Sequence, residues 1–159
     1  EARSRYEIWN TLGWPYETSV AMMRLVLSGL FDHHPGIKII THHLGGMIPF
    51  FANRIDSALA TLGTRTTDED LREVTAGLAR PPAEYFKLFY GDTALFGGVP
   101  GTRCGIEYFG IDHVVFATVA PFGPIPDALA AIDVLDLDAA DRGRLLCVNA
   151  ERLMNTSFE

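Results

Sequence analysis

Three short runs of β-branched and aromatic residues most constrain what this chain can fold into. They cover residues 37–41, 88–90 and 114–118. Between them, apolar residues recur at helical spacing, so that strands and helices alternate along the chain. Alternation of this kind predicts βαβ units, because two parallel strands need a crossover, usually a helix, to join them. We therefore expect an α/β fold with a parallel sheet.

Helical patterns fill most of the remaining sequence. A helix is expected over 17–31, because Pro15 fixes the backbone just ahead of the polar residues that open it. Further helices are expected over 51–62, 68–78, 83–87, 125–133, 138–147 and 150–154, with a looser helical region over 94–110. Thr67 or Asp68 is expected to cap the helix at 68–78. Three strands do not close a barrel, so the pattern alone leaves open a small doubly wound sheet or a part of a barrel.

Composition sets limits on function. Hydrophobic residues make up 48% of the 159 residues and charged residues 21%, the balance of an ordinary globular protein. The formal net charge of −7 argues against nucleic-acid binding, since such a surface needs clustered basic residues. The basic residues are scattered and no apolar run is long enough for a bilayer, so we expect no membrane partner. Two distant cysteines and no secretory signal favour a cytoplasmic protein.

Five stretches of the sequence carry a resemblance to a known family. They are GWPYETSVAM (13–22), GIKIITHHLGGMIPFFANRI (36–55), YFKLFYGDTALFGG (85–98), DHVVFATVAPFG (112–123) and NAERLM (149–154). In this order and spacing they resemble the amidohydrolase-2 family, which includes aminocarboxymuconate-semialdehyde decarboxylase and γ-resorcylate decarboxylase. The resemblance implies a (β/α)8 TIM barrel in which the three runs are strands six to eight. It implies that residues 1–159 form one partial domain, the C-terminal portion of the barrel with its flanking helices.

The family's active site lies at the C-terminal ends of the barrel strands and holds a divalent metal, commonly zinc. The resemblance implies the ligands: an H-x-H pair on strand one, a histidine on strand five and an aspartate closing strand eight. Strands one and five fall outside this sequence. At the strand-eight position the chain has Val119, whose side chain offers no lone pair to a cation. We therefore expect no metal ligand and no bound metal in this chain, while the parent family is expected to use zinc.

His43 falls where the family keeps a histidine at the end of strand six. The resemblance implies that His43 is catalytic and moves a proton at the metal-bound water or the substrate, as an imidazole does near neutral pH. The residues alone equally allow a turn histidine hydrogen-bonded to the backbone. His42 is expected to point the other way along the strand and to be structural. His113, at the start of the eighth strand, is assigned no chemistry.

Arg54 and Phe122 are the expected substrate-binding residues. Arg54 matches an arginine that, in family dimers, reaches the neighbouring subunit's site and pairs with a substrate carboxylate. Its alternative is an exposed helix residue paired with Asp56 or Asp68. Phe122 follows strand eight and forms either an apolar wall of the pocket or an ordinary part of the core. Asp92, after strand seven, is expected either to hydrogen-bond within the rim of the site or to cap the next helix.

Two functions are compatible with these features. The first is a metal-dependent decarboxylase or hydrolase acting on a small aromatic or unsaturated carboxylic acid, here as an incomplete chain that lacks the metal ligands. The second is a non-catalytic remnant of the same fold, serving as an interaction or structural module. The parent family is expected to be a metal-dependent carboxy-lyase or hydrolase, whereas the chain alone is expected to be inactive, because working metal sites supply several protein ligands. In both cases open sheet edges predict a homo-oligomer, a dimer as in the family, or association with the N-terminal half of the barrel.

Overall fold

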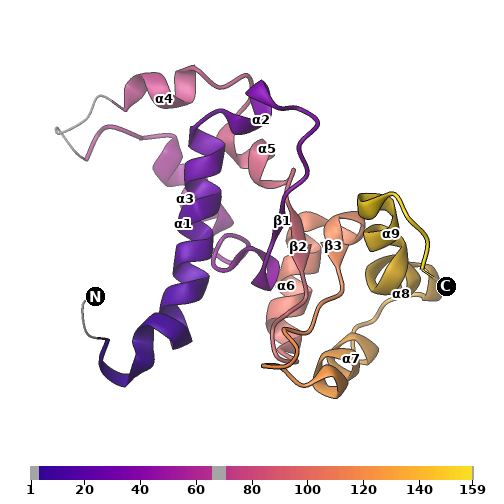
Figure 1. Ribbon diagram of the computed structural model, residues 1–159. Helices are drawn as coiled ribbons and strands as arrows, with labels where there is room; N and C mark the ends of the chain where they lie inside the picture. Colours follow the sequence, from indigo (N-terminus) through magenta and orange to yellow (C-terminus); the bar gives the residue numbers. More distant parts are fainter. Residues whose placement is uncertain (1–3, 66–70, 159) are drawn as a thin grey trace. The chain divides into compact units, whose positions relative to one another are not determined.

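The computed structural model describes residues 4–65 and 71–158, which divide into two compact units (Figure 1). The first unit comprises the described residues of 1–37 and 46–88, and the second comprises those of 38–45 and 89–159. The short segment that carries His43 therefore belongs to the second unit, although the sequence on both sides of it belongs to the first. Every helix in the described part of the chain is too short or too polar to cross a bilayer.

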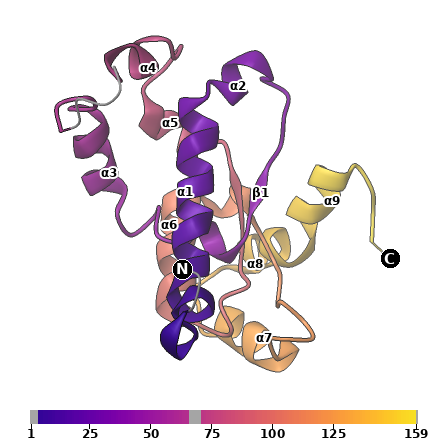
Figure 2. The same ribbon diagram turned by 60° about the vertical axis from the view of Figure 1, so that its left-hand side comes forward.

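The first unit is helical. It contains α1 (Trp14–Leu27), α2 (Leu30–His33), α3 (Ala52–Leu59), α4 (Arg72–Ala76) and α5 (Pro82–Phe86), preceded by short helical turns at Arg5–Glu7 and Trp9–Gly13. Figure 2 shows α1 from a second side. The core combines Met22 and Val26 of α1 with Phe31 of α2 and with Tyr85 and Phe86 of α5, each of which is 4% exposed or less. Burial of these large side chains holds the helices together.

The helix expected over 17–31 is confirmed, with two differences at its ends. It begins at Trp14, because Pro15 is accepted in the first turn, where its missing N–H is not needed. It ends at Leu27, because Gly29 adopts a left-handed conformation with φ 71° and separates α1 from α2. The helix expected over 68–78 is the shorter α4. Its expected caps, Thr67 and Asp68, lie outside the described residues.

The second unit contains three parallel strands in the order β1-β2-β3, which confirms the predicted α/β class (Figure 1). The strands are β1 (Ile40–Thr41), β2 (Tyr90–Asp92) and β3 (Val114–Val115). Thr41 lies opposite Gly91, and Asp92 lies opposite Val115. Because the strands are parallel and in register, their C-terminal ends meet at one end of the sheet. The turns that follow them therefore come together there.

The strands are shorter than the runs that predicted them. The first run pairs only over Ile40–Thr41, and Ile40 is 51% exposed, although a β-branched run of this kind predicts a buried strand. β2 begins two residues later than expected, at Tyr90. β3 ends at Val115 because the next N–H, that of Phe116, donates to the carbonyl of Leu145 at 3.0 Å instead of to a strand. The hydrogen-bond partners of the backbone, and not the type of side chain, therefore set the bounds of the three strands.

Four helices complete the second unit: α6 (Val99–Phe109), α7 (Ile125–Asp133), α8 (Ala139–Gly143) and α9 (Asn149–Met154). A π-helical turn, Arg144–Val148, joins α8 to α9, so the helices expected separately at 138–147 and 150–154 form one continuous segment. Asn149 anchors this segment. Its amide is fully buried and donates to the carbonyls of Ile111 at 2.8 Å and Val114 at 2.7 Å, beside the start of β3.

Candidate functional site

The turn after β1 positions His43. His43 and Leu44 both have left-handed backbones, with φ of 54° and 49°. The side chain of Leu44 is only 2% exposed and packs onto two glycines. A Cβ added to Gly91 of β2 would lie 2.8 Å from Leu44, and one added to Gly105 of α6 would lie 2.6 Å from it. Because only glycine leaves this room, the two glycines allow Leu44 to fix the turn against the sheet.

A carboxylate at the end of β2 holds the same turn. One oxygen of Asp92 accepts the N–H of His43 at 2.8 Å and the N–H of Ala94 at 3.0 Å. The Nδ1 atom of His43 in turn contacts the carbonyl oxygen of Ala94. Asp92 thus forms the hydrogen bonds that were expected of it, while their place in the rim of an active site stays a prediction. The alternative, a cap on the next helix, is wrong, because α6 begins at Val99 without any side-chain cap.

The other two histidines of the sheet differ in their surroundings. The ring of His42 meets the ring of His43 edge-on at 4.5 Å. Partial burial, and then the neighbouring charge of His43, lower the pKa of His42, so that it is neutral over more of the pH range. The Nδ1 atom of His113 lies 3.1 Å from the carbonyl oxygen of Phe89, and its ring stacks on Tyr90 at 4.4 Å. Both contacts join the start of β3 to the segment around β2.

The turn after β3 contains Val119, the residue at which the resemblance predicts an aspartate ligand in the family. Val119 there has a left-handed backbone with φ 59°, which is a rare conformation for a β-branched residue. Its carbonyl accepts the N–H of Phe122 at 2.8 Å and that of Gly123 at 3.1 Å. Thr93 ties the turns after β2 and β3 together, since its hydroxyl accepts the N–H of Ala117 at 3.0 Å. The backbone of this turn is therefore well held, although its side chain offers no metal ligand.

The two phenylalanines beside these turns differ from expectation. Phe122 is 83% exposed, so its reading as a core residue is wrong, while its role as a pocket wall stays a prediction. Phe96, which the sequence did not single out, has its ring 6.3 Å from that of His43. A Cβ added to Gly123 would lie 3.4 Å from the ring of Phe96. Phe96 thus lies close both to His43 and to the turn after β3.

Within the described residues, no group of three or more histidine, cysteine, aspartate or glutamate side chains is arranged to hold a metal ion. His43 and Asp92 lie together, but the Asp92 oxygen is already shared between two backbone N–H groups. Val119 adds no donor. The residues described here therefore do not fit a metal centre by themselves.

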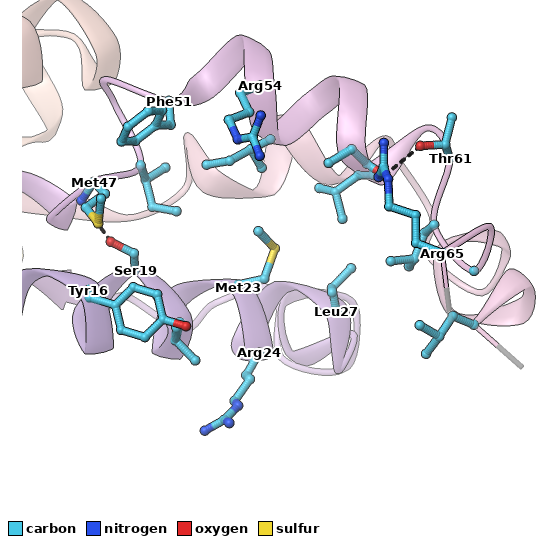
Figure 3. Close-up of a pocket in the computed structure, with 18 residues that line it drawn as sticks. Tyr16, Ser19, Met23, Arg24, Leu27, Met47, Phe51, Arg54, Thr61 and Arg65 are labelled. Carbon is cyan, nitrogen blue, oxygen red and sulfur yellow. Dashed lines mark hydrogen bonds between the residues drawn. The ribbon is translucent and has the colours of Figure 1, made fainter. Parts of the chain in front are cut away.

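Arg54 belongs to the first unit, whereas His43 and Phe122 belong to the second. It is an exposed residue of α3 and lines an open, largely apolar cavity of about 710 Å³ between α1 and α3 (Figure 3). Figure 3 shows Met23 and Leu27 pointing into this space and Arg24 pointing away from it. No ion pair joins Arg54 to Asp56 in the described part of the chain, and Asp68 lies outside that part. No motif in the sequence predicts this cavity.

The sequence profile of the amidohydrolase family matches residues 3–155, nearly the whole chain. The chain belongs to the amidohydrolase family. Among curated proteins, this amidohydrolase is 31% identical over 144 residues to γ-resorcylate decarboxylase of Polaromonas sp. (strain JS666 / ATCC BAA-500), covering 90% of this chain and 42% of that protein. It is 32% identical over 115 residues to 6-methylsalicylic acid decarboxylase of Penicillium expansum, covering 70% of this chain and 32% of that protein.

Solved structures give the same picture. 5-Carboxyvanillate decarboxylase LigW from Sphingomonas paucimobilis has a TM-score of 0.76 and 29% identity to this amidohydrolase, covering 91% of this chain and 42% of that one. Dihydroxybenzoic acid decarboxylase from Polaromonas sp. JS666, with bound manganese and the inhibitor 2-nitroresorcinol, has a TM-score of 0.74 and 28% identity, covering 96% and 48%. The chain thus spans less than half the length of these relatives. Its small parallel sheet and helices match those of amidohydrolase-type decarboxylases.

Proposed function

We propose that this amidohydrolase supplies the C-terminal portion, strands six to eight, of a (β/α)8 barrel that decarboxylates a small aromatic carboxylic acid. The observation that carries the proposal is similarity in sequence and fold to aromatic-acid decarboxylases over about nine-tenths of the chain. The arrangement of the second unit supports it. The turns that hold His43 and Asp92 lie at the C-terminal ends of parallel strands, where barrels of this class carry their catalytic groups.

In the proposed reaction the bond between the ring carbon and the carboxylate breaks. Carbon dioxide leaves, the electron pair stays on the ring carbon, and that carbon takes up a proton. His43 donates this proton and regains one from solvent, as a histidine does near neutral pH. Arg54 pairs with the carboxylate of the substrate in a neighbouring subunit, for which a guanidinium fork is well shaped. Phe122 provides an apolar surface beside the ring.

The metal expected for the family does not fit the described residues of this chain. Val119 stands at the position of the strand-eight ligand, and no group of three potential ligands is assembled in the described part. A relative with bound manganese shows that a divalent metal occurs among similar decarboxylases. We therefore assign no catalytic step of this chain to a metal. Zinc as the metal, a dimeric state and a cytoplasmic location stay predictions from the sequence.

Val119 also favours a second candidate function, that of a non-catalytic module. Exchange of the aspartate for valine removes a ligand that decarboxylation by this family is expected to need. A chain that has lost it can keep the fold and serve as an interaction surface. The two candidates differ in whether any form of the protein turns over an aromatic acid.

The test compares the chain alone with the chain extended by whatever coding sequence precedes residue 1 in its gene. Both are incubated with 2,6-dihydroxybenzoate, 5-carboxyvanillate and 6-methylsalicylate in the presence of Mn²⁺, and carbon dioxide is measured. We expect the extended protein to release it from at least one acid. His43→Asn should lower kcat about a hundredfold, whereas the adjacent His42→Asn should change it little. An extended protein that is folded and metal-loaded but inactive would favour the non-catalytic module.

A further inference from the structure

We propose that Asp92 is a positioning residue that keeps the proton of neutral His43 on Nδ1 and leaves Nε2 as the atom that takes up and releases protons. The proposal rests on the proposed function in one respect, the role of His43 as the proton carrier. The arrangement itself is a property of the second unit, so it is tested without turnover.

The first step concerns the ring of His43. Its Nδ1 atom lies against the carbonyl oxygen of Ala94, which only accepts hydrogen bonds. Nδ1 must therefore carry a hydrogen in the neutral ring. The lone pair then sits on Nε2, the outer nitrogen of the ring. His43 as a residue is half-buried. This is the tautomer that a proton carrier working through Nε2 requires.

The second step concerns what holds the carbonyl and the ring together. A single oxygen of Asp92 accepts the N–H of His43 at 2.8 Å and the N–H of Ala94 at 3.0 Å. One carboxylate thus fixes both the backbone that bears the ring and the residue whose carbonyl faces it. The acceptor is charged, and such hydrogen bonds are stronger than neutral ones. Removal of this side chain frees both residues at once.

The third step is that Asp92 is the acceptor for the N–H of His43 among the described residues, whereas Leu44 holds the same turn by packing alone. His43 has a left-handed backbone, so its N–H is not part of the strand pairing between β1 and β2, which ends at Thr41 and Gly91. Thr93 is held independently, because its N–H donates to the carbonyl of Val115 at 3.0 Å. Loss of the Asp92 side chain should therefore loosen the turn after β1 while leaving the sheet paired.

The experiment uses the chain with 15N-labelled histidine, at a pH where its imidazoles are neutral, and reads the tautomer from long-range 1H–15N spectra. In the wild type, His43 should be protonated on Nδ1. Asp92→Asn should preserve this tautomer, because its amide oxygen still accepts both N–H groups. Asp92→Ala should shift His43 to a mixture in which Nε2–H, the form favoured by free imidazole, predominates. His113, whose Nδ1 faces the carbonyl of Phe89, is an internal control that should not change.

Several outcomes would overturn the proposal. One is an Nε2–H tautomer of His43 in the wild type, and another is an unchanged tautomer in a folded Asp92→Ala variant. If Asp92→Ala does not fold, Asp92→Glu replaces it. The longer side chain keeps the charge but moves the oxygen, so it should also lose the Nδ1–H tautomer, and retention of that tautomer would contradict the proposal.

Kinetic measurements distinguish a positioning role of Asp92 from a merely structural one. In the active form sought above, Asp92→Ala should lower kcat about tenfold or more with little change in KM, and Asp92→Asn should restore most of the rate. A rise in KM of the same size with an unchanged kcat would count against a positioning role of Asp92. If no form of the protein is active but the tautomer changes as expected, the proposed function fails and the positioning of His43 by Asp92 stands.

Discussion

The phenol oxygen of Tyr85 lies 2.6 Å from both carboxylate oxygens of Asp32, and so joins α5 to the end of α2. Asp32 also accepts the N–H of Ala79 at 3.1 Å, and the Tyr85 oxygen accepts the N–H of Arg80 at 3.2 Å. The hydrogen bond from Tyr85, and then that from Ala79, lower the pKa of Asp32. Burial, and then Asp32, raise the pKa of Tyr85. The pair is therefore an acid-sensitive link within the first unit.

Tyr85→Phe should destabilise the chain at pH 7 and much less in acid. Folding lowers the pKa of Asp32, so the stabilisation that its hydrogen bond with Tyr85 gives to the fold is fully present above the unfolded pKa of about 4. This stabilisation is lost as the pH falls through the lowered pKa of the folded chain. Urea unfolding at pH 7 and near pH 2 measures this. Tyr16→Phe, at an exposed tyrosine of α1, is the control and should have no such effect. Equal losses for Tyr85→Phe at both pH values would contradict the prediction.

Gly105→Ala should lower the free energy of unfolding by about 1–3 kcal/mol, because the new methyl overlaps Leu44 and the core must shift. The added Cβ would lie 2.6 Å from the Leu44 side chain. Gly143→Ala is the matched control, since a Cβ there meets nothing within 4 Å. Because Gly143 lies in the helix α8, alanine there should instead raise the free energy of unfolding by about 0.5–1 kcal/mol. Chemical denaturation of both variants tests the pair, and a neutral Gly105→Ala would show that the turn is loosely packed.

Val119→Asn should raise the free energy of unfolding by about 1 kcal/mol, because asparagine adopts a left-handed backbone more readily than valine. Val148→Asn is the control: Val148 is exposed and has a right-handed backbone with φ −59°, so the same exchange should bring no gain. Thermal unfolding of both variants measures the difference. A destabilised Val119→Asn variant would mean that packing of the valine side chain outweighs its backbone.

Neither the chain nor its Val119→Asp variant should retain a stoichiometric divalent metal after dialysis. The variant would gain one carboxylate at the right turn, but working sites of this class supply at least three protein ligands. Elemental analysis of protein without a histidine tag is the measurement. Tight binding of zinc or manganese by the variant would contradict the prediction. It would mean that the described side chains come closer together in solution than they do in this structure.

The chain should self-associate at micromolar concentration. Among the described strands, β1 and β3 each pair on one side only, and Ile40 of β1 is 51% exposed. Unpaired edges of this kind favour pairing with another chain. Ile40→Lys should reduce the mass measured by light scattering, whereas Ile125→Lys, at an exposed position of α7, should not. A wild-type monomer that unfolds cooperatively would refute the expectation of open edges that need a partner.

Local patterns sufficed for the element types and for the position of His43. The three runs of β-branched and aromatic residues and the turn after the first of them are visible in the sequence, so the parallel sheet and the histidine at its end were predictable. The strand bounds were not, since they depend on which backbone groups find partners. That Phe116 donates to Leu145, far along the chain, cannot be read from a run of valines.

The contacts that hold the site were hidden for the same reason. Leu44 is an unremarkable leucine until Gly91 and Gly105 are brought against it by the fold. Phe96 and Phe122 have the same side chain, and only the structure shows which of them approaches His43. The sequence thus singled out His43 and Asp92, whereas the packing of Leu44 and Phe96 around His43 could not be predicted from it.

The left-handed backbone at Val119 bears on how easily this position changes over evolutionary time. Substitution of Val119 by aspartate, asparagine or glycine relaxes the backbone and so stabilises the fold. The protein then lies further above the minimum stability that selection requires. Selection for stability therefore does not oppose an aspartate at this position. The valine, with its left-handed backbone, is the residue that stability alone does not explain.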